Sequence, residues 1–283
     1  MSNHIIILAK ETAGDKDFFN RWAEVGTIHK VPGQKQMQLI NIMVVDHRVD
    51  VTLGLISGFP NLKYVVSPNT GDTHIKCNLS SKGIELINLK GEYKFLRSIR
   101  SVSEHVFNLI FRSLRPCYGF GTLLHKKTIG ILGFGRIGHH VYDLARGFGM
   151  KVMTWDKGSH DVGLKLMFKH CDIVSVHLEE NEQTKGLIDA SLLKLMPKGG
   201  LIVNTARASI IDEMDLKCFL EKGLIKAALD VVENRDLLND QTLGLVVSDH
   251  VGGSTVEDRV ATDEFIISKL KKAMKRGSTG LIQ

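Results

Sequence analysis

Hydrophobic residues follow two spacings that alternate along the chain. Short apolar runs such as Ile5–Ala9 predict buried strands, whereas apolar residues three or four positions apart, such as Ile137, Val141 and Leu144, predict helices. Strands that alternate with helices indicate parallel sheets and an α/β fold. We expect strands at 4–9, 62–66, 84–88, 129–132, 151–155, 173–178, 201–204, 227–232 and 245–248, with at least one more in 25–52. We expect helices at 14–24, 73–82, from 101 onward, 137–148, 189–196, 212–222 and 255–275, and a turn or short helix at 53–59.

Three glycines lie where the strand at 129–132 gives way to a helix. Gly133, Gly135 and Gly138 have the G-x-G-x-x-G spacing, and Asp156 closes the next strand 18 residues after the last of them. Such glycines permit a tight turn, let a pyrophosphate approach the backbone and let the helix pack on the strand. An ordinary strand-to-helix turn is the alternative. The strand, the helix and the acid together favour a dinucleotide site.

The same pattern divides the chain into two lobes. Six strands are counted from Ile129, the number in a complete dinucleotide-binding sheet. Ser101 and Glu104 fit a capping box at the start of the helix that leads into this lobe. The last helix is expected to return to the first lobe. The expected domains are therefore 1–100 (first lobe), 101–254 (dinucleotide-binding lobe) and 255–283 (returning helix).

Composition narrows the class of protein. The 283 residues are 43% hydrophobic and 24% charged, which is typical of a globular protein with two domains. No apolar stretch reaches the ~20 residues of a membrane helix, so no membrane partner is expected. The four cysteines are scattered, which favours reduced thiols in the cytoplasm and no metal site. The net charge of +6 suits an anionic small molecule, and without aromatic interleaving it does not indicate nucleic-acid binding.

Ligands of open parallel sheets collect beyond the carboxyl ends of the strands. Arg207 and His250 both follow predicted strands, and hydride transfer to a keto acid needs such a pair. The guanidinium would bind the carboxylate in a fork, and the imidazolium would protonate the developing alkoxide. Taken singly, Arg207 could be a structural ion pair, His250 is one of twelve histidines, and Asp230 could be a cap.

The sequence resembles the D-isomer-specific 2-hydroxyacid dehydrogenase family over nearly its whole length. The resemblance is strongest at 70–75, 103–105, 133–138, 204–207 and 250–255. It implies a doubly wound NAD-binding domain inserted into a smaller flavodoxin-like substrate domain, and a homodimer joined through the cofactor lobe. It also implies an NAD-dependent oxidoreductase that acts on a small, anionic 2-hydroxy acid or 2-keto acid.

The resemblance assigns roles to residues. Arg207 matches the substrate-binding arginine and His250 the acid/base histidine, while Asn69, Thr70 and Gly71 match a loop whose N–H groups help hold the carboxylate. The residues expected to contact NAD are Gly133, Gly135, Arg136, Ile137, Gly138, Asp156, His177, Thr205, Ala206, Asp230, Gly252 and Gly253. Asp156 favours NAD, although the neighbouring Lys157 leaves room for NADP.

One departure from the family pattern keeps a second function open. The family's glutamate that orients the histidine is here Arg235, and a cation beside His250 would lower the pKa of that imidazole. Either Glu233 or Asp236 replaces the missing carboxylate, or the protein is slow or inactive. The alternative function is a non-catalytic NAD(H)-binding sensor or scaffold. Retention of Arg207 and His250 favours the enzyme.

Overall fold

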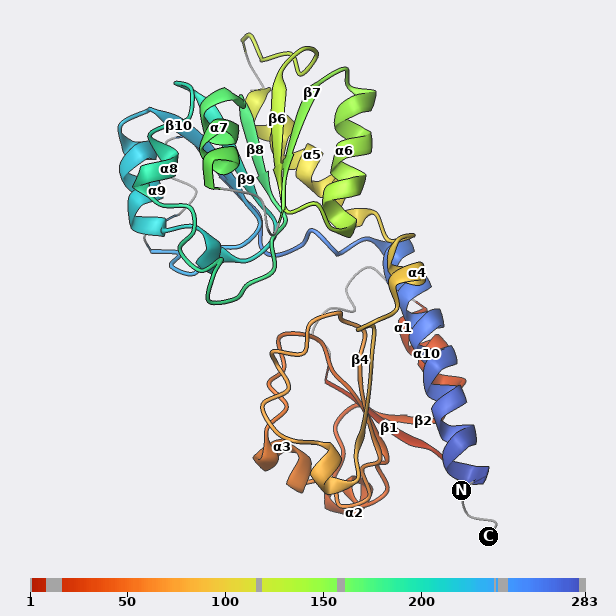
Figure 1. Ribbon diagram of the computed structural model, residues 1–283. Helices are drawn as coiled ribbons and strands as arrows, with labels where there is room; N and C mark the ends of the chain where they lie inside the picture. Colours follow the sequence, from red (N-terminus) through yellow and green to blue (C-terminus); the bar gives the residue numbers. More distant parts are fainter. Residues whose placement is uncertain are drawn as a thin grey trace. The chain divides into compact units, whose positions relative to one another are not determined.

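The structure is a computed structural model, and it describes residues 2–8, 17–115, 119–156, 161–236, 238 and 244–279 (Figure 1). Two compact units make up the chain. Unit 1 comprises Met1–Ser98 and Thr255–Gln283, and unit 2 comprises Ile99–Ser254. The chain therefore leaves unit 1, builds unit 2 without interruption and returns through its last helix.

Unit 1 contains a five-stranded sheet in which every neighbouring pair of strands is parallel. Its strands are β1 (His4–Ile7), β2 (Thr27–His29), β3 (Ile42–Val44), β4 (Tyr64–Ser67) and β5 (Glu85–Asn88). Its helices are α1 (Phe18–Ala23), α2 (Gln34–Met37), α3 (Leu53–Ser57), α4 (Tyr93–Leu96), α10 (Val256–Thr279) and the 3₁₀ turn η1 (Ser80–Lys82). The strand order β2-β1-β3-β4-β5 is that of flavodoxin-like sheets, as the resemblance implies.

Helix α1, from the first part of the chain, packs against the last helix, α10, in unit 1. Phe18 and Trp22 of α1 pack with Ile266 and Leu270 of α10, and all four side chains are fully buried. The carboxylate of Asp263, on α10, accepts a 2.8 Å hydrogen bond from the Arg21 guanidinium of α1. Basic residues of α10 also pair with acids of unit 1, as Lys269 does with Glu92, Lys271 with Glu24 and Arg276 with Glu85.

Unit 2 contains a six-stranded sheet, and all its ladders are parallel. Its strands are β6 (Thr128–Leu132), β7 (Lys151–Trp155), β8 (Ile173–Val176), β9 (Gly200–Asn204), β10 (Ile225–Leu229) and β11 (Leu245–Val247). Its helices are α5 (Ser101–Leu114), α6 (Arg136–Gly147), α7 (Asp161–His170), α8 (Ala190–Leu193), α9 (Glu213–Glu221) and the 3₁₀ turn η2 (Ala208–Ile210). The order β11-β10-β9-β8-β6-β7 reverses direction beside β6, which creates the topological switch point where ligands bind in doubly wound sheets.

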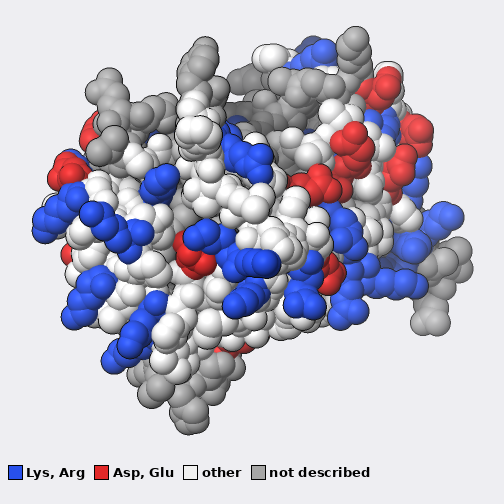
Figure 2. Space-filling view, turned by 90° about the horizontal axis from the view of Figure 1, so that it is seen from above, with Lys and Arg blue, Asp and Glu red and all other residues white. Residues whose placement is uncertain are grey.

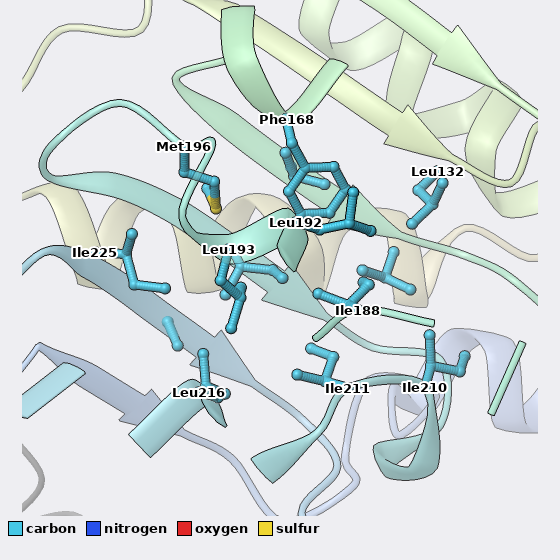
Figure 3. Packing of buried hydrophobic residues seen from close by; sticks show 14 of the residues in the cluster. Leu132, Phe168, Ile188, Leu192, Leu193, Met196, Ile210, Ile211, Leu216 and Ile225 are labelled. Atoms are coloured by element: carbon cyan, nitrogen blue, oxygen red, sulfur yellow. The ribbon is translucent and has the colours of Figure 1, made fainter. Parts of the chain in front are cut away.

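Helices cover both faces of the six-stranded sheet (Figure 1). Helices α5 and α6 pack on one face, and α7, α8 and α9 lie over the other. Figure 3 shows side chains of the buried cluster on this second side of the sheet, among them Phe168, Leu192, Ile210 and Leu216. Each such side chain contributes about 1.5–3 kcal/mol when fully buried. The central strands β6, β8 and β9 are buried almost throughout, whereas the edge strand β7 is not.

Most expected elements are confirmed, including all six strands from Ile129 and two strands within 25–52. The helix expected at 73–82 is wrong except for η1. Val51 N–H donates to the His74 carbonyl and Lys76 N–H donates to the Val51 carbonyl, so this segment is extended and paired. The capping box is also wrong, because Arg100 occupies the N-cap of α5 and Ser101 is already helical.

The described surface is charged and mixed. Figure 2 shows Lys and Arg side chains spread over the visible face, with Asp and Glu among them. No helix in the described part of the chain is long and apolar enough to cross a membrane.

Candidate active site

The glycine turn after β6 has the shape of a phosphate cradle. Gly133 adopts φ +99°, and a Cβ there would lie 2.6 Å from the His177 carbonyl oxygen. A Cβ on Gly138 would lie 2.3 Å from the Gly133 carbonyl oxygen, so the helix can pack this closely only without a side chain. Gly135, in contrast, faces open space at the N-terminus of α6. The helix N–H groups and dipole are therefore available to an anion above Gly135.

Two buried polar atoms at the same sheet edge fit a polar ligand. Nδ1 of His177, just past β8, and Oγ1 of Thr205, just past β9, are buried without a hydrogen-bond partner in the described structure. Burial lowers the pKa of His177 to about 3, so the ring is neutral at physiological pH. Its other nitrogen, Nε2, lies 2.8 Å from Ser175 Oγ. A dinucleotide's polar groups would satisfy such atoms, and the residues present therefore fit NAD.

The remaining cofactor candidates lie around this turn in different settings. Asp156 follows β7 and is exposed. The Arg136 guanidinium donates a 3.2 Å hydrogen bond to the Ile99 carbonyl at the start of α5, which ties the first turn of α6 to that helix. Ile137 is half-buried and packs into the core under α5 and α6.

Arg207 and His250 line one pocket of about 330 Å³. The other residues of its wall are Glu180, Ala208, Ser209, Asp230, Val231, Val232, Glu233, Arg235 and Asp249. The side chain of Asn204, which is 1% exposed, fixes the turn that carries Arg207. It donates to the Arg207 carbonyl and accepts from the Ala206 N–H, both at 2.9 Å. The structure therefore brings the two residues of the predicted pair to one cavity, both on turns held from within unit 2.

Asp230 organises the loop that bears His250. Its buried carboxylate accepts hydrogen bonds from Ser248 Oγ at 2.6 Å and from the N–H groups of Val251 and Gly252 at 2.9 Å, and His105 Nε2 lies 3.3 Å away. Burial raises the pKa of this carboxyl, but these hydrogen bonds outweigh it and hold the pKa well below its usual range. The carboxylate is thus ionised, with its oxygens directed at the loop. A nicotinamide contact stays a prediction for this residue.

His250 itself has a constrained backbone. Its φ of +52° is in the left-handed region, which few residues other than glycine adopt, and its N–H donates to the Asp230 carbonyl at 2.8 Å. A Cβ on the next glycine, Gly252, would lie 2.8 Å from the Asp230 carboxylate, whereas Gly253 faces open space. Strained residues of this kind concentrate at functional sites.

Arg235 is engaged by the residue before His250. Its Nη2 donates to Asp249 Oδ1 at 3.0 Å and to the Ser248 carbonyl at 3.3 Å. The guanidinium at the position expected to hold a glutamate is thus paired with a carboxylate. Glu233 lines the same pocket as His250, while Asp236 is not part of the pocket wall.

Three positioning residues were missed by sequence reasoning. Glu213, in the first turn of α9, accepts the N–H groups of Glu233 at 2.7 Å and Asn234 at 3.0 Å and so fixes the segment beside the pocket. His105 and Ser248 complete the network around Asp230. His105 lies in one of the segments that carry the resemblance, but the helical pattern alone gave no sign that it reaches Asp230.

Asn69, Thr70 and Gly71 belong to unit 1 and follow β4. Asn69 Nδ2 donates to Ser67 Oγ at 3.1 Å, and Ser67 Oγ in turn lies 3.0 Å from His74 Nε2. The Asn69 carbonyl accepts from Leu89 N–H. This loop is therefore anchored at the end of its strand, and its role in holding a carboxylate stays a prediction.

A doubly wound parallel sheet with a glycine turn at its switch point defines a dinucleotide-binding α/β protein. Residues 94–252 match the family model described as D-isomer specific 2-hydroxyacid dehydrogenase, NAD binding domain. The chain belongs to this family of NAD-linked oxidoreductases, which confirms both the resemblance and NAD as the cofactor.

Similar proteins agree with this assignment. The chain is 29% identical over 265 residues to hydroxypyruvate reductase from Thermotoga maritima, covering 83% of this chain and 85% of the relative. It is 27% identical over 289 residues to D-3-phosphoglycerate dehydrogenase from Methanocaldococcus jannaschii, covering 89% of this chain but only 54% of that protein. NAD⁺-bound 3-phosphoglycerate dehydrogenase from Entamoeba histolytica has the same fold, with a TM-score of 0.79, 21% identity and coverage of 98% and 97% of the two chains.

Proposed function

We propose that this protein is an NAD-dependent dehydrogenase that interconverts a small 2-keto acid and its D-2-hydroxy acid. The observation that carries the proposal is the pocket that holds Arg207 and His250 together. Relatives named hydroxypyruvate reductase, glyoxylate reductase and glycerate dehydrogenase support substrates of this class.

Each residue of the pair has a defined task in the proposed reduction. NADH, when bound, would supply the hydride that reduces the carbonyl carbon of the substrate, with NAD⁺ as the oxidised product. Arg207 binds the carboxylate in a bidentate fork and orients the carbonyl. His250 donates a proton to the carbonyl oxygen as the carbon–oxygen π bond opens, which yields the hydroxyl group. In the oxidation direction the neutral imidazole accepts that proton.

The cofactor would be held by residues of unit 2 alone. The open face of Gly135 and the N-terminus of α6 would hold the pyrophosphate, beside Arg136 and Ile137, and Asp156 would accept hydrogen bonds from the ribose hydroxyls. His177, Thr205 and Ala206, which follow β8 and β9, would offer further polar contacts to the cofactor. Asp230, Gly252 and Gly253 form the loop side of this site.

The charges around His250 favour the enzyme over the sensor. A proton donor needs a carboxylate near its ring and no free cation. Asp249 neutralises Arg235 at 3.0 Å, and Glu233, held by the Glu213 clamp, is the carboxylate we assign to His250. A scaffold that only binds NADH has no use for this arrangement.

We also propose a homodimer joined through unit 2 and a cytoplasmic location. Phe120 and Leu123 are strongly exposed in unit 2, as an association surface requires, and the described cysteines Cys77, Cys171 and Cys218 are free thiols. Light scattering coupled to size exclusion tests the dimer, because a monomer mass at micromolar concentration contradicts it.

The activity is tested by following NADH oxidation with glyoxylate and hydroxypyruvate. We expect turnover by the wild type, and we expect Arg207→Lys to lower kcat/KM at least tenfold while NADH affinity is unchanged, because lysine cannot form the fork. Arg112→Lys, a matched change on helix α5, should alter neither value. Tight NADH binding with no reduction of any 2-keto acid would establish the sensor instead.

A further inference from the structure

The pocket around Arg207 contains more negative than positive groups. Glu180, Asp230, Glu233 and Asp249 contribute four carboxylates, whereas the guanidinium groups are those of Arg207 and Arg235. Such a balance is unexpected in a site that binds an anionic substrate. The contacts of each charged group show which carboxylate is not paired with a cation of the pocket.

Two of these carboxylates have partners in the described structure, and the proposed function assigns a partner to a third. Asp249 pairs with Arg235 at 3.0 Å, and the buried Asp230 is surrounded by donors from the loop that carries His250 and by His105 of α5. In the proposed function, Glu233 serves the imidazolium of His250 and Arg207 serves the carboxylate of the substrate. Among the described residues of unit 2 that line this pocket, Glu180 is the carboxylate to which no cation is assigned.

Glu180 is held in the wall of the pocket. It lies on the loop between β8 and α8, and its Oε1 accepts a 2.8 Å hydrogen bond from Ser209 Oγ. Ser209 is two residues after Arg207 and lines the same pocket. One hydroxyl donor satisfies only part of a carboxylate, which has about four acceptor positions. The remaining positions can accept from a ligand bound at Arg207.

We propose that Glu180 selects 2-keto acids whose side chain ends in a cation, an ammonium or a guanidinium, and rejects those with a second anionic group. This inference rests on the proposed function. The substrate carboxylate that binds Arg207 neutralises that arginine. A second anionic group on the substrate would then be repelled by Glu180, with no cation of the pocket left to pair with it. A distal cation instead completes the charge balance of the pocket. Like-charge repulsion and unpaired charge are common means of discrimination between ligands.

The test compares three substrates that differ in the charge of the side chain. NADH oxidation is measured with 2-oxo-5-guanidinopentanoate, with neutral 2-oxohexanoate and with 2-oxoglutarate. We expect kcat/KM to fall about tenfold from the cationic to the neutral substrate and again to the dianion. The preference should shrink between 20 mM and 500 mM salt, because ions screen an exposed carboxylate such as that of Glu180.

Two substitutions test whether Glu180 causes the preference for a cationic substrate. Glu180→Gln should bring the cationic and neutral substrates within about threefold of each other, and Glu180→Lys should make 2-oxoglutarate the best of the three. Glu182→Gln, on the same loop but outside the pocket wall, should keep the wild-type order.

The possible failures are distinct. If the wild type reduces glyoxylate but treats cationic and neutral substrates alike, or if the order survives Glu180→Gln, the role of Glu180 is wrong and the dehydrogenase stands. If no 2-keto acid is reduced although NADH binds, both proposals fall.

Discussion

Substitution of Asp230 by asparagine tests whether this residue organises the loop that carries His250. The carboxylate is 2% exposed and receives hydrogen bonds from Ser248, Val251 and Gly252. An amide keeps one acceptor oxygen but turns an NH₂ group toward a buried donor. The best arrangement keeps Ser248 and Val251 on the oxygen and leaves the Gly252 N–H facing the new NH₂.

The cost follows from these contacts. One lost hydrogen bond to a charged group is worth about 1.5–3 kcal/mol, and the unsatisfied buried donors add about 1–3 kcal/mol. We therefore expect Asp230→Asn to lower the free energy of unfolding of unit 2 by about 3 kcal/mol. At about 2–4 °C per kcal/mol, the melting temperature falls by about 6–12 °C.

The assay is thermal unfolding followed by circular dichroism, with Asp249→Asn as the control. Asp249 is 90% exposed, so its ion pair with Arg235 is worth less than about 1 kcal/mol. Hydrogen exchange at the Gly252 amide should rise only in the Asp230 variant, while the Val251 amide keeps its acceptor. A melting temperature within 1 °C of wild type, with unchanged exchange, would refute the reasoning.

The pH dependence of the same pair of proteins gives an independent check. The pKa of Asp230 is lowered in the folded state, so its stabilisation is fully present above the ordinary aspartate pKa of about 3.9 and is lost as pH falls below that value. The difference between wild type and Asp230→Asn should be constant from pH 5 to 7 and narrow below about pH 4.

Three further predictions concern the cofactor cradle, a buried histidine and the packing of unit 1. Gly135→Ala should weaken NADH binding at least tenfold in a fluorescence titration, because its Cβ enters the space for the pyrophosphate; Gly147→Ala on the same helix, also facing open space, should not. Burial lowers the pKa of His177 to about 3, so the free energy of unfolding of the wild type should fall by about 1.4 kcal/mol per pH unit below about pH 6.5. Urea unfolding of His177→Gln should show a smaller fall down to pH 5. Parallel curves for the two proteins would contradict the buried neutral ring. Asp263→Ala should destabilise unit 1 by about 3–5 kcal/mol in urea unfolding, because Arg21 loses its buried partner. Glu24→Ala, which removes the exposed pair with Lys271, should cost under about 0.5 kcal/mol. Similar losses in the two variants would show that burial of the ion pair does not matter here.

The sequence by itself determined the elements that depend on local pattern. The central strands β6, β8 and β9 of unit 2 are largely apolar runs, because a parallel sheet covered by helices on both faces must be hydrophobic on both faces. The roles of Gly133, Gly135 and Gly138 could be predicted because they depend on the absence of a Cβ at a fixed spacing. The sequence shows both the residue type and the spacing. Arg207 and His250 were found because strand ends meet at one edge of such a sheet.

Only the tertiary structure decided the contacts between segments that are distant in the sequence. The extended segment at 74–76 owes its form to Val51, a partner more than twenty residues away that outweighs the local helical pattern. The pairing of Arg235 with Asp249, the clamp of Glu213 on Glu233 and the enclosure of Asp230 by His105 and Ser248 depend on side-chain directions after folding. A periodicity argument gives the face on which a residue lies. It does not give the partner that its charged group reaches, and around His250 that partner sets the chemistry of the site.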